Sequence, residues 1–443
     1  MRARALPTLR VIIERGVTSI ATSPQPDPVR PPPTPHAAPR FPNPFRTLRR
    51  HPNFRLFWAG QTASLVGTWM QSVAQAWLAL ELTGDAFLVG LVSAAGSLPV
   101  LLFSLYAGVL ADRHDKLRLV RAAQAFLLVQ ATMLWWFHWS GHITIGWLLA
   151  LALLGGTINA FDIPARQSLI IELVDRDDLI DAIALNSSGF NLARILGPSI
   201  AAVIIARFGL EWCFAANAVS YGAVLAGLAR IRLPRHGSPA RSASSPLGGL
   251  RSGLVYMRQT PEVAALMRLV AVYSIFGVPY LVLLPVIARD VLHRDAGAYG
   301  FLLTCVGVGA LTAALALAGV GQRVARGRLL AVASHVFGLL LIAFSFSRSL
   351  HLSAALLLGV GFTMILTNAL SNALLQSIVP DALRGRVMAA YAFVFVGMGP
   401  FGALFAGTMA KLVGVPGAVA LGASVTLAYA LWAFGRSAPI REL

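Results

Sequence analysis

Apolar runs of about 20 residues, the length that crosses a bilayer as a helix, follow one another from Asn53 almost to the end of the chain. The pattern predicts twelve spans, near 55–80, 86–111, 117–138, 143–165, 182–207, 211–231, 263–288, 297–321, 328–347, 351–377, 386–411 and 415–435. The one long break, 232–260, holds Arg, Pro and Ser without an apolar run, which is typical of a linker. We therefore expect two six-span halves, 46–231 and 261–436, followed by a short tail, 437–443.

The segment before the first span, 1–45, has a different composition, rich in Pro and Arg. Such a segment buries little apolar surface and is expected to be disordered. It is not a signal peptide, because its longest apolar stretch, Val11–Ile13, is far too short. A start codon placed too far upstream would explain the segment equally well.

Short motifs recur at equivalent spans of the two halves, at nearly constant offsets. The matched pairs are Asn159-Ala160 with Asn368-Ala369 (209 residues), Asp112-Arg113 with Gln322-Arg323 (210) and Gly197-Pro198 with Gly399-Pro400 (202). Together they predict an all-α integral membrane fold with two six-helix pseudo-repeats around a central cavity. Rocking of such halves about a midplane site is a plan of secondary transporters, whereas a channel or a membrane enzyme does not require the symmetry.

Composition and charge agree with a membrane protein and give its orientation. Charged residues are 12% of the chain, against about 25% in soluble domains, and 36 Lys plus Arg face 18 Asp plus Glu, a net charge of +18. The predicted outer loops hold five of the basic residues: Arg207, Arg289, Arg294, Arg348 and Lys411. This asymmetry predicts a multi-pass protein of the bacterial cytoplasmic (inner) membrane with both termini in the cytoplasm. A nucleic-acid partner is not expected, because the charge is spread over loops.

Polar side chains recur at helical spacing in the first span and again in the tenth. The cavity and substrate candidates are Gln61, Thr68, Gln71, Gln75, Asn159, Asn191, Thr367, Asn368 and Asn372. Such side chains face protein or water rather than lipid, so they line either a hydrated cavity or a helix–helix contact. Glutamine is large for close helix packing, which favours the cavity.

Three ionisable residues in the fourth and fifth predicted spans are coupling candidates: Asp162, Arg166 and Arg194. Arg194 lies midway along its span, where a charge is expensive and indicates function by default. Asp162, a carboxylate well inside a span of the first half, is its expected partner. The pair is either a proton-coupling or gating element, or a static ion pair near the cytoplasmic end.

The loop after the second span runs from Gly108 through Asp112, Arg113 and Lys116 to Arg118, and it resembles the signature loop of the major facilitator superfamily. The resemblance implies that Gly108, Asp112, Arg113 and Arg118 latch the cytoplasmic gate; Asp115-Lys116 stands where a glycine and a basic residue are common. A second stretch, from Phe161 to Gln167 and from Ala184 to Pro198, is similar to the enterobactin-exporter-like branch. Gly197 and Pro198, with Gly399 and Pro400, resemble the kink motif of proton-driven exporters, although the later glycines are replaced by Ala201 and Ala202.

Other chemistry finds little support in the sequence. The two cysteines, Cys213 and Cys305, lie in apolar runs, and His138 with His142 borders a predicted outer loop, so no metal is expected. The sequence contains no phosphate-binding glycine loop of the kind that would indicate ATP hydrolysis, and an enzyme is not expected. The sequence thus predicts a monomeric secondary transporter, without a cofactor, in the lipid bilayer. The expected activity is export of amphipathic drugs or siderophores coupled to protons. An importer or uniporter, and a membrane sensor or scaffold that moves nothing, remain as alternatives.

Overall fold

The computed structural model describes residues 44–231, 256–320 and 325–436. The predicted N-terminal extension (1–45) apart from its last two residues, the linker (232–260) up to residue 255, and the C-terminal tail (437–443) lie outside these ranges. The described residues form helices and turns.

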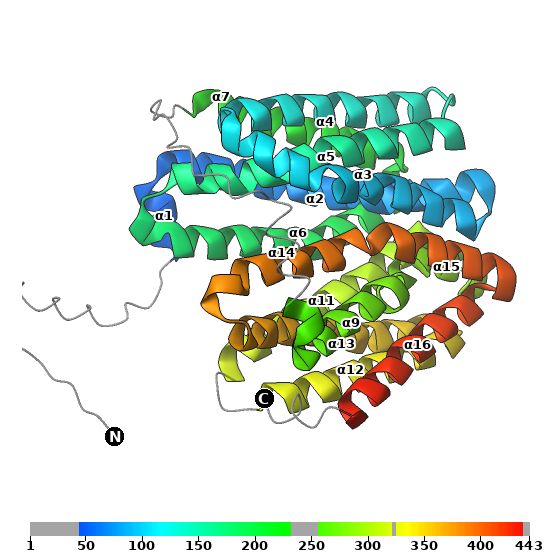
Figure 1. Ribbon diagram of the computed structural model, residues 1–443. Coiled ribbons are helices and arrows are strands. Elements are labelled where there is room, and N and C mark those ends of the chain that lie inside the picture. Colours follow the sequence, from blue (N-terminus) through cyan, green and yellow to red (C-terminus); the bar gives the residue numbers. More distant parts are fainter. Residues whose placement is uncertain (1–43, 232–255, 321–324, 437–443) are drawn as a thin grey trace, which may run out of the picture. The chain divides into compact units, whose positions relative to one another are not determined.

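The first half consists of a short helix and six long ones (Figure 1). They are α1 (Pro44–Arg50), α2 (Pro52–Thr83), α3 (Ala86–Arg113), α4 (Lys116–Trp139), α5 (Ile145–Leu173), α6 (Leu179–Phe208), preceded by the 3₁₀ turn η1 (Arg176–Asp178), and α7 (Glu211–Arg230). The turns between them are short because side chains cap the helices: Asp85 accepts from the backbone of Phe87, and Asp115 from that of Arg118.

The second half has the same number of spans, but two of them are interrupted. The first span of this half, the seventh of the chain, consists of α9 (Pro261–Val272), η2 (Tyr273–Gly277), α10 (Tyr280–Val286) and η3 (Ile287–Val291). The segments η2 and η3 are π-helical. The others are α11 (Ala296–Val320), α12 (Arg326–Phe346), α13 (Leu350–Ile378), α14 (Asp381–Gly397) with α15 (Gly399–Val413), and α16 (Val415–Arg436).

The two halves repeat each other in their packing. In the first half α3 packs on α5 and α4 on α7; in the second half, α11 packs on α13 and α12 on α16. The halves meet where α3 contacts α15 and α6 contacts α11. These four inter-half helices are equivalent pairs, the second span on the eleventh and the fifth on the eighth. The predicted helical membrane fold with two pseudo-repeats is confirmed, while eleven of the twelve predicted spans are apolar enough among the described helices to be candidate spans.

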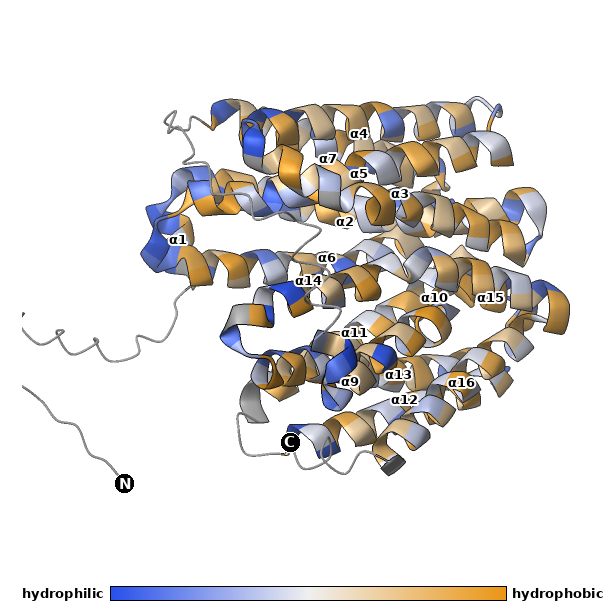
Figure 2. Cartoon of the chain, in the orientation of Figure 1, coloured by the Kyte–Doolittle hydropathy of each residue, from blue (hydrophilic) through white to orange (hydrophobic). Residues whose placement is uncertain are grey.

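Large apolar side chains face outward along the helices. Val219, Phe346 and Phe126 are each more than half exposed (73%, 71% and 62%), and hydrophilic residues gather at the end of the bundle that carries α1 (Figure 2). A soluble protein does not expose so much apolar surface. Eleven of the described helices are long and apolar enough to cross a membrane, and α2 is not among them. At 32 residues α2 has the length for a span, and its Gln, Ser and Thr side chains lower its hydropathy.

Two local expectations need correction. The fourth span ends at Leu173 and not near residue 165, because the charge of Arg166 is paired within the helix and does not end it. The two Gly-Pro motifs also differ: α6 continues as one helix through Gly197 and Pro198, whereas the helix breaks before Gly399. The Gly197 backbone approaches α2 so closely that an added Cβ would lie 2.3 Å from the Cβ of Trp69. The first motif therefore lies at a close packing contact, and its role as a kink stays a prediction.

Candidate functional site

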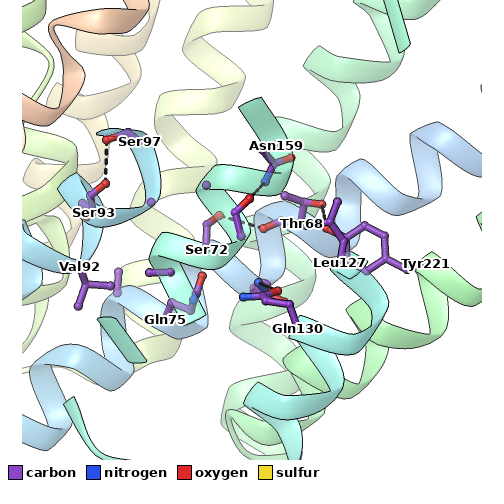
Figure 3. A pocket seen from close by; sticks show the side chains of 16 residues that line it. Thr68, Ser72, Gln75, Val92, Ser93, Ser97, Leu127, Gln130, Asn159 and Tyr221 are labelled. Atoms are coloured by element: carbon purple, nitrogen blue, oxygen red, sulfur yellow. Dashed lines mark hydrogen bonds between the residues drawn. The ribbon is translucent and has the colours of Figure 1, made fainter. Parts of the chain in front are cut away.

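A cavity of about 420 Å³ lies in the first half between α2, α3, α4, α5, α6 and α7, and its wall combines polar and apolar side chains. A second cavity of about 300 Å³ adjoins it, and the two share Thr68, Ser72, Asn159 and Tyr221 among their walls. Figure 3 shows the smaller cavity, with the side chains of Thr68, Ser72 and Gln75 from α2 facing those of Ser93 and Ser97 from α3. Polar side chains thus face a space large enough for water or a ligand.

The sequence predicts a central cavity between the two halves. The larger cavity described above lies instead mostly within the first half. Among the described residues that line the larger space, Val396 of α14 comes from the second half, and all others come from the first. The halves themselves meet where α3 packs on α15 and α6 packs on α11.

The polar stripe of α2 enters the cavity as predicted from its spacing. Gln61, Thr68, Gln71 and Gln75 line one or both spaces, together with Asn159 of α5. The side-chain oxygen of Gln61 is buried and has no hydrogen-bond partner, which leaves it free to accept from a polar ligand.

Gln71 also belongs to a buried hydrogen-bond network. Its Nε2 donates to Oε1 of Gln130 (3.3 Å), and its Oε1 accepts from Nδ2 of Asn217 (2.8 Å). Gln130 in turn donates to the backbone oxygen of Leu151 (3.0 Å). The network joins α2, α4, α5 and α7, so both of the sequence interpretations, cavity wall and helix packing, apply to the same residue.

The remaining cavity candidates lie elsewhere. Asn191 donates to the backbone oxygen of Ser187 in its own helix. Thr367 and Asn368 border a void with no measurable free volume, and Asn372 lines a separate hollow with Gln376 and Arg384. The tenth span repeats the sequence pattern of the fourth, but its polar face is packed against η2 and α9.

Asp162 is the carboxylate in the wall of the larger cavity, and its side chain is 1% exposed. Its Oδ2 lies 2.6 Å from Nε of Arg166, four residues along α5, and both of its oxygens accept from Nε2 of Gln124 at 3.2 Å. Residues at this spacing are neighbours on a helix surface. Asp162 is thus a buried carboxylate held by one cation and one amide at the edge of a cavity.

The expected pairing of Asp162 with Arg194 is wrong. Arg194 of α6 reaches across to the second half, where Nη2 lies 3.8 Å from the Sδ of Met364. The sequence offered the correct partner, since Arg166 is one turn from Asp162 on the same helix. Gln124 was missed; its signal was a glutamine inside the apolar third span, which also contains Gln130.

Aromatic side chains, which were not among the candidates predicted from helical spacing, also line the cavity. Trp69 and Phe190 lie edge to face, with ring centroids 6.1 Å apart, and both line the larger space. Tyr221, on α7, lies within hydrogen-bonding distance of the Thr68 hydroxyl (3.1 Å). The cavity therefore combines amides, one ion pair and aromatic faces, which suits an amphipathic molecule.

The loop between α3 and α4 makes contacts that differ from those the resemblance implies. An added Cβ on Gly108 would meet nothing within 4 Å, and Arg113 is exposed; the side chain of Asp112 lies outside the described part. Arg118 pairs with Asp115 (3.4 Å), and Lys116 pairs with Glu172 at the end of α5. The two residues that depart from the family pattern thus hold this loop, and the latch role of the other four stays a prediction.

One group of described residues has the geometry of a metal site. Ligand atoms of His51, Asp175 and Asp178 lie within 4.8 Å of one another. Arg50 already lies against both carboxylates, at 3.6 Å from Asp175 and 3.2 Å from Asp178. Its charge opposes a bound cation, so the group is better described as an ion-pair cluster that fastens α1 to α6.

Comparison with known proteins agrees with this geometry. A family model described as "Transmembrane secretion effector" matches residues 43–442. This chain belongs to that family, within the major facilitator superfamily. The staphyloferrin A transporter of Staphylococcus aureus is 25% identical over 82% of this chain and 90% of its own length, and the multidrug efflux pump Tap of Mycolicibacterium fortuitum is 27% identical over 83% and 91%.

Solved structures show the same fold. The crystal structure of the nucleoside transporter NupG superposes with a TM-score of 0.72 at 10% identity, over 86% of this chain and 98% of that one. Family and relatives identify the chain as a multi-pass membrane transporter of the major facilitator type.

Two polar contacts join the halves at the end of the bundle opposite α1. Nη1 of Arg289 in η3 donates to the backbone oxygen of Leu80 (2.9 Å), and Lys411 of α15 lies 3.8 Å from Asp85. Both basic residues belong to the five that the sequence analysis placed on the outer side. They join the last turn of α2 and the first turn of α3 to the second half, which closes this end.

Loss of the Arg289 contact is expected to open that end. In a protein with both native cysteines replaced by alanine and Gln75→Cys as the reporter, Arg289→Gln should speed labelling by a membrane-impermeant maleimide about fivefold, the equivalent of roughly 1 kcal/mol. The rate is measured in oriented vesicles. Arg348→Gln is the matched control, because Arg348 donates only to the neighbouring Ser347 in the described structure. Equal rates in the two variants would contradict a closing role for Arg289.

Proposed function

We propose that this protein is a proton-coupled exporter of small amphipathic molecules. The observation that carries the proposal is the cavity of about 420 Å³ with the buried Asp162–Arg166 pair in its wall, next to an interface between the halves that is closed at the far end by Arg289 and Lys411. Such a site takes up a ligand from the α1 end, and rocking of the halves releases it at the other.

The α1 end is the cytoplasmic end in this proposal, and both termini lie there. Basic residues are abundant in the described segments at that end, among them Arg46, Arg49, Arg50, Arg113, Arg118, Arg176, Arg326, Arg328, Arg384 and Arg386, which fits the positive-inside rule for a bacterial cytoplasmic membrane. Each chain holds its own cavity, so a monomer suffices. The proton gradient is the energy source, without a further cofactor.

The relatives support a drug or a siderophore as the cargo. One is a staphyloferrin A transporter and another a multidrug efflux pump, and the aromatic and amide lining of this cavity suits either class. Amphipathic cargo uses both kinds of wall: the rings of Trp69 and Phe190 for an apolar part, and the amides of Gln61 and Asn159 for a polar part.

The proposal is tested in cells and in proteoliposomes with erythromycin, ethidium and staphyloferrin A as probes. Cells that express the protein should accumulate less of at least one probe than cells that lack it, and nigericin, which collapses the pH gradient, should abolish the difference. Proteoliposomes with an acidic lumen should concentrate the same probe. Higher accumulation in expressing cells would identify an importer. Movement that nigericin does not affect would identify a uniporter. If none of the three probes moved, export of these classes of molecule would be contradicted.

A further inference from the structure

Arg194 is a guanidinium inside the bundle whose charge the described structure does not balance. Its contact across the interface is with a thioether, Met364, which is a weak acceptor. Asp162, the nearby carboxylate expected to pair with it, is already held by Arg166 and Gln124. A cation within a membrane span is retained for function by default, so its partner is to be sought outside the chain.

Two tyrosine hydroxyls in the same neighbourhood are also without partners. Tyr273 and Tyr280 of the seventh span are buried (2% and 3% exposed), neither hydroxyl has a hydrogen-bond partner among the described residues, and both lie within electrostatic range of Arg194. Buried polar groups are almost always hydrogen-bonded. Two unsatisfied donors beside one unpaired cation form a set that matches an anion.

The backbone that carries the tyrosines is itself unusual. Tyr273 begins the π-helical segment η2, and the neighbouring Ser274 hydroxyl is buried and unpartnered as well. Single π-helical turns inside α-helices are frequent at functional sites. The ring of Tyr273 packs on Phe337 (4.6 Å between centroids), and that of Tyr280 lies near Phe344 (6.4 Å), so neighbouring rings hold both side chains in place.

Arg194 does not itself line the large cavity, but it follows residues of α6 that do. Asn186 and Phe190 line that cavity, and Arg194 follows Phe190 by four residues, which places it one turn farther on the same face of α6. Phe190 also lies edge to face with Trp69 (6.1 Å). A molecule whose apolar part lies against these two rings therefore has its other end within reach of the guanidinium.

We propose that Arg194, assisted by the hydroxyls of Tyr273 and Tyr280, binds the carboxylate of an amphipathic organic anion. The planar guanidinium donates two parallel hydrogen bonds to a carboxylate, and the tyrosines donate to the same group. A phosphate ester, such as a lipid headgroup, offers related chemistry, and the test separates the two. The inference rests on the proposed function only in taking the anion to be cargo; the binding itself needs no gradient.

The experiment is an equilibrium binding titration at constant pH, in neutral detergent, with energy transfer from tryptophan to pyrene as the signal. The probes are 1-pyrenebutyrate, its uncharged match 1-pyrenebutanamide, and 1-pyrenebutyl phosphate. The native chain should bind the carboxylate about tenfold more tightly than the amide, and the phosphate no more tightly than the carboxylate. Tighter binding of the phosphate would overturn the carboxylate assignment in favour of a headgroup.

Variants then locate the preference. Arg194→Gln should bind acid and amide within about twofold of each other, Arg194→Lys should keep part of the preference, and Tyr280→Phe should lower acid binding about threefold while leaving the amide unchanged. Arg207→Gln, an exposed position on the same helix, controls for nonspecific charge. A preference that survives in Arg194→Gln, or no preference in the native chain, would overturn the proposal. Because no gradient is present, this outcome is independent of whether transport is proton-coupled.

Discussion

Asp162→Asn is expected to reduce pH-driven accumulation of a transported probe to the level of protein-free liposomes, while exchange of the same probe without a gradient continues. Asparagine has nearly the shape of aspartate and can still accept from Gln124 (3.2 Å in the native protein), but it cannot carry a proton. Asp162 is the carboxylate among the described cavity-lining residues. Without it, substrate movement and proton movement are no longer linked.

The measurement uses proteoliposomes with an acidic lumen and the probe that moves in the native protein, compared with counterflow at equal pH. Asp162→Glu should keep part of the coupled accumulation. Asp178→Asn is the matched control, because this carboxylate pairs with Arg50 and His51 outside the cavity. If gradient-driven accumulation in Asp162→Asn equalled that of the native protein, the pair with Arg166 would be a static ion pair.

Removal of the charge also has a stability consequence, which separates the two roles. Breaking a fully buried pair costs about 3–5 kcal/mol, but Arg166 is 16% exposed at the cavity edge, so water screens its charge and the loss should be smaller. Asp162→Asn should therefore remain folded, as judged by size-exclusion chromatography. A variant that is inactive in counterflow as well would show that substrate passage itself, and not the coupling, had been lost.

Gly361→Ala and Gly156→Ala are expected to lower the stability of the folded protein sharply. A Cβ at Gly361 would lie 2.1 Å from the backbone oxygen of Val306, and one at Gly156 would lie 2.2 Å from that of Gly96. Backbone atoms cannot move away by changing rotamer, as a side chain can. In Gly361→Ala the helices α11 and α13 must therefore separate, and in Gly156→Ala the helices α3 and α5 must separate. Overpacking of this kind costs about 1–3 kcal/mol and occasionally more, and close small-residue contacts hold membrane helices together.

The stability is measured as the apparent melting temperature of the detergent-solubilised protein. Gly222→Ala is the matched control, since a Cβ there would meet nothing within 4 Å and alanine improves helix propensity by about 1 kcal/mol. The control should melt at or above the native temperature and the two test variants several degrees below it. Melting of Gly361→Ala with the control would contradict the close approach of α11 and α13.

The equivalence of these two glycines illustrates what the internal repeat means physically. Gly156 lies in the fourth span against the second, and Gly361 lies in the tenth against the eighth. The sequence repeat was found from polar pairs such as Asn159 and Asn368. The structure shows that those asparagines have different surroundings: Asn159 lines a cavity, whereas Asn368 lies among closely packed side chains. Gly156 and Gly361, in contrast, each allow two helices of their half to approach closely.

The sequence by itself determined the order and the apolar character of the spans, because apolar length and helical periodicity are local properties on which insertion into a bilayer depends. It also determined that one face of α2 is polar, and it drew attention to Asp162 and Arg194 as charges that insertion does not explain. The ends of the helices were predicted less accurately. Helix α5 extends to Leu173, and Arg166 lies within it, paired with Asp162 one turn away.

Partners and cavities were decided only by the tertiary structure. Periodicity gives the face on which a side chain lies but not which helix packs there. For this reason Asp162 was assigned to Arg194, when α6 turns that arginine toward Met364 and two unpartnered tyrosines in the other half. The position of the larger cavity inside the first half is seen only when α2 to α7 are packed together, because each of these helices contributes to its wall. Such contacts depend on how whole helices pack, and no single stretch of sequence contains that information.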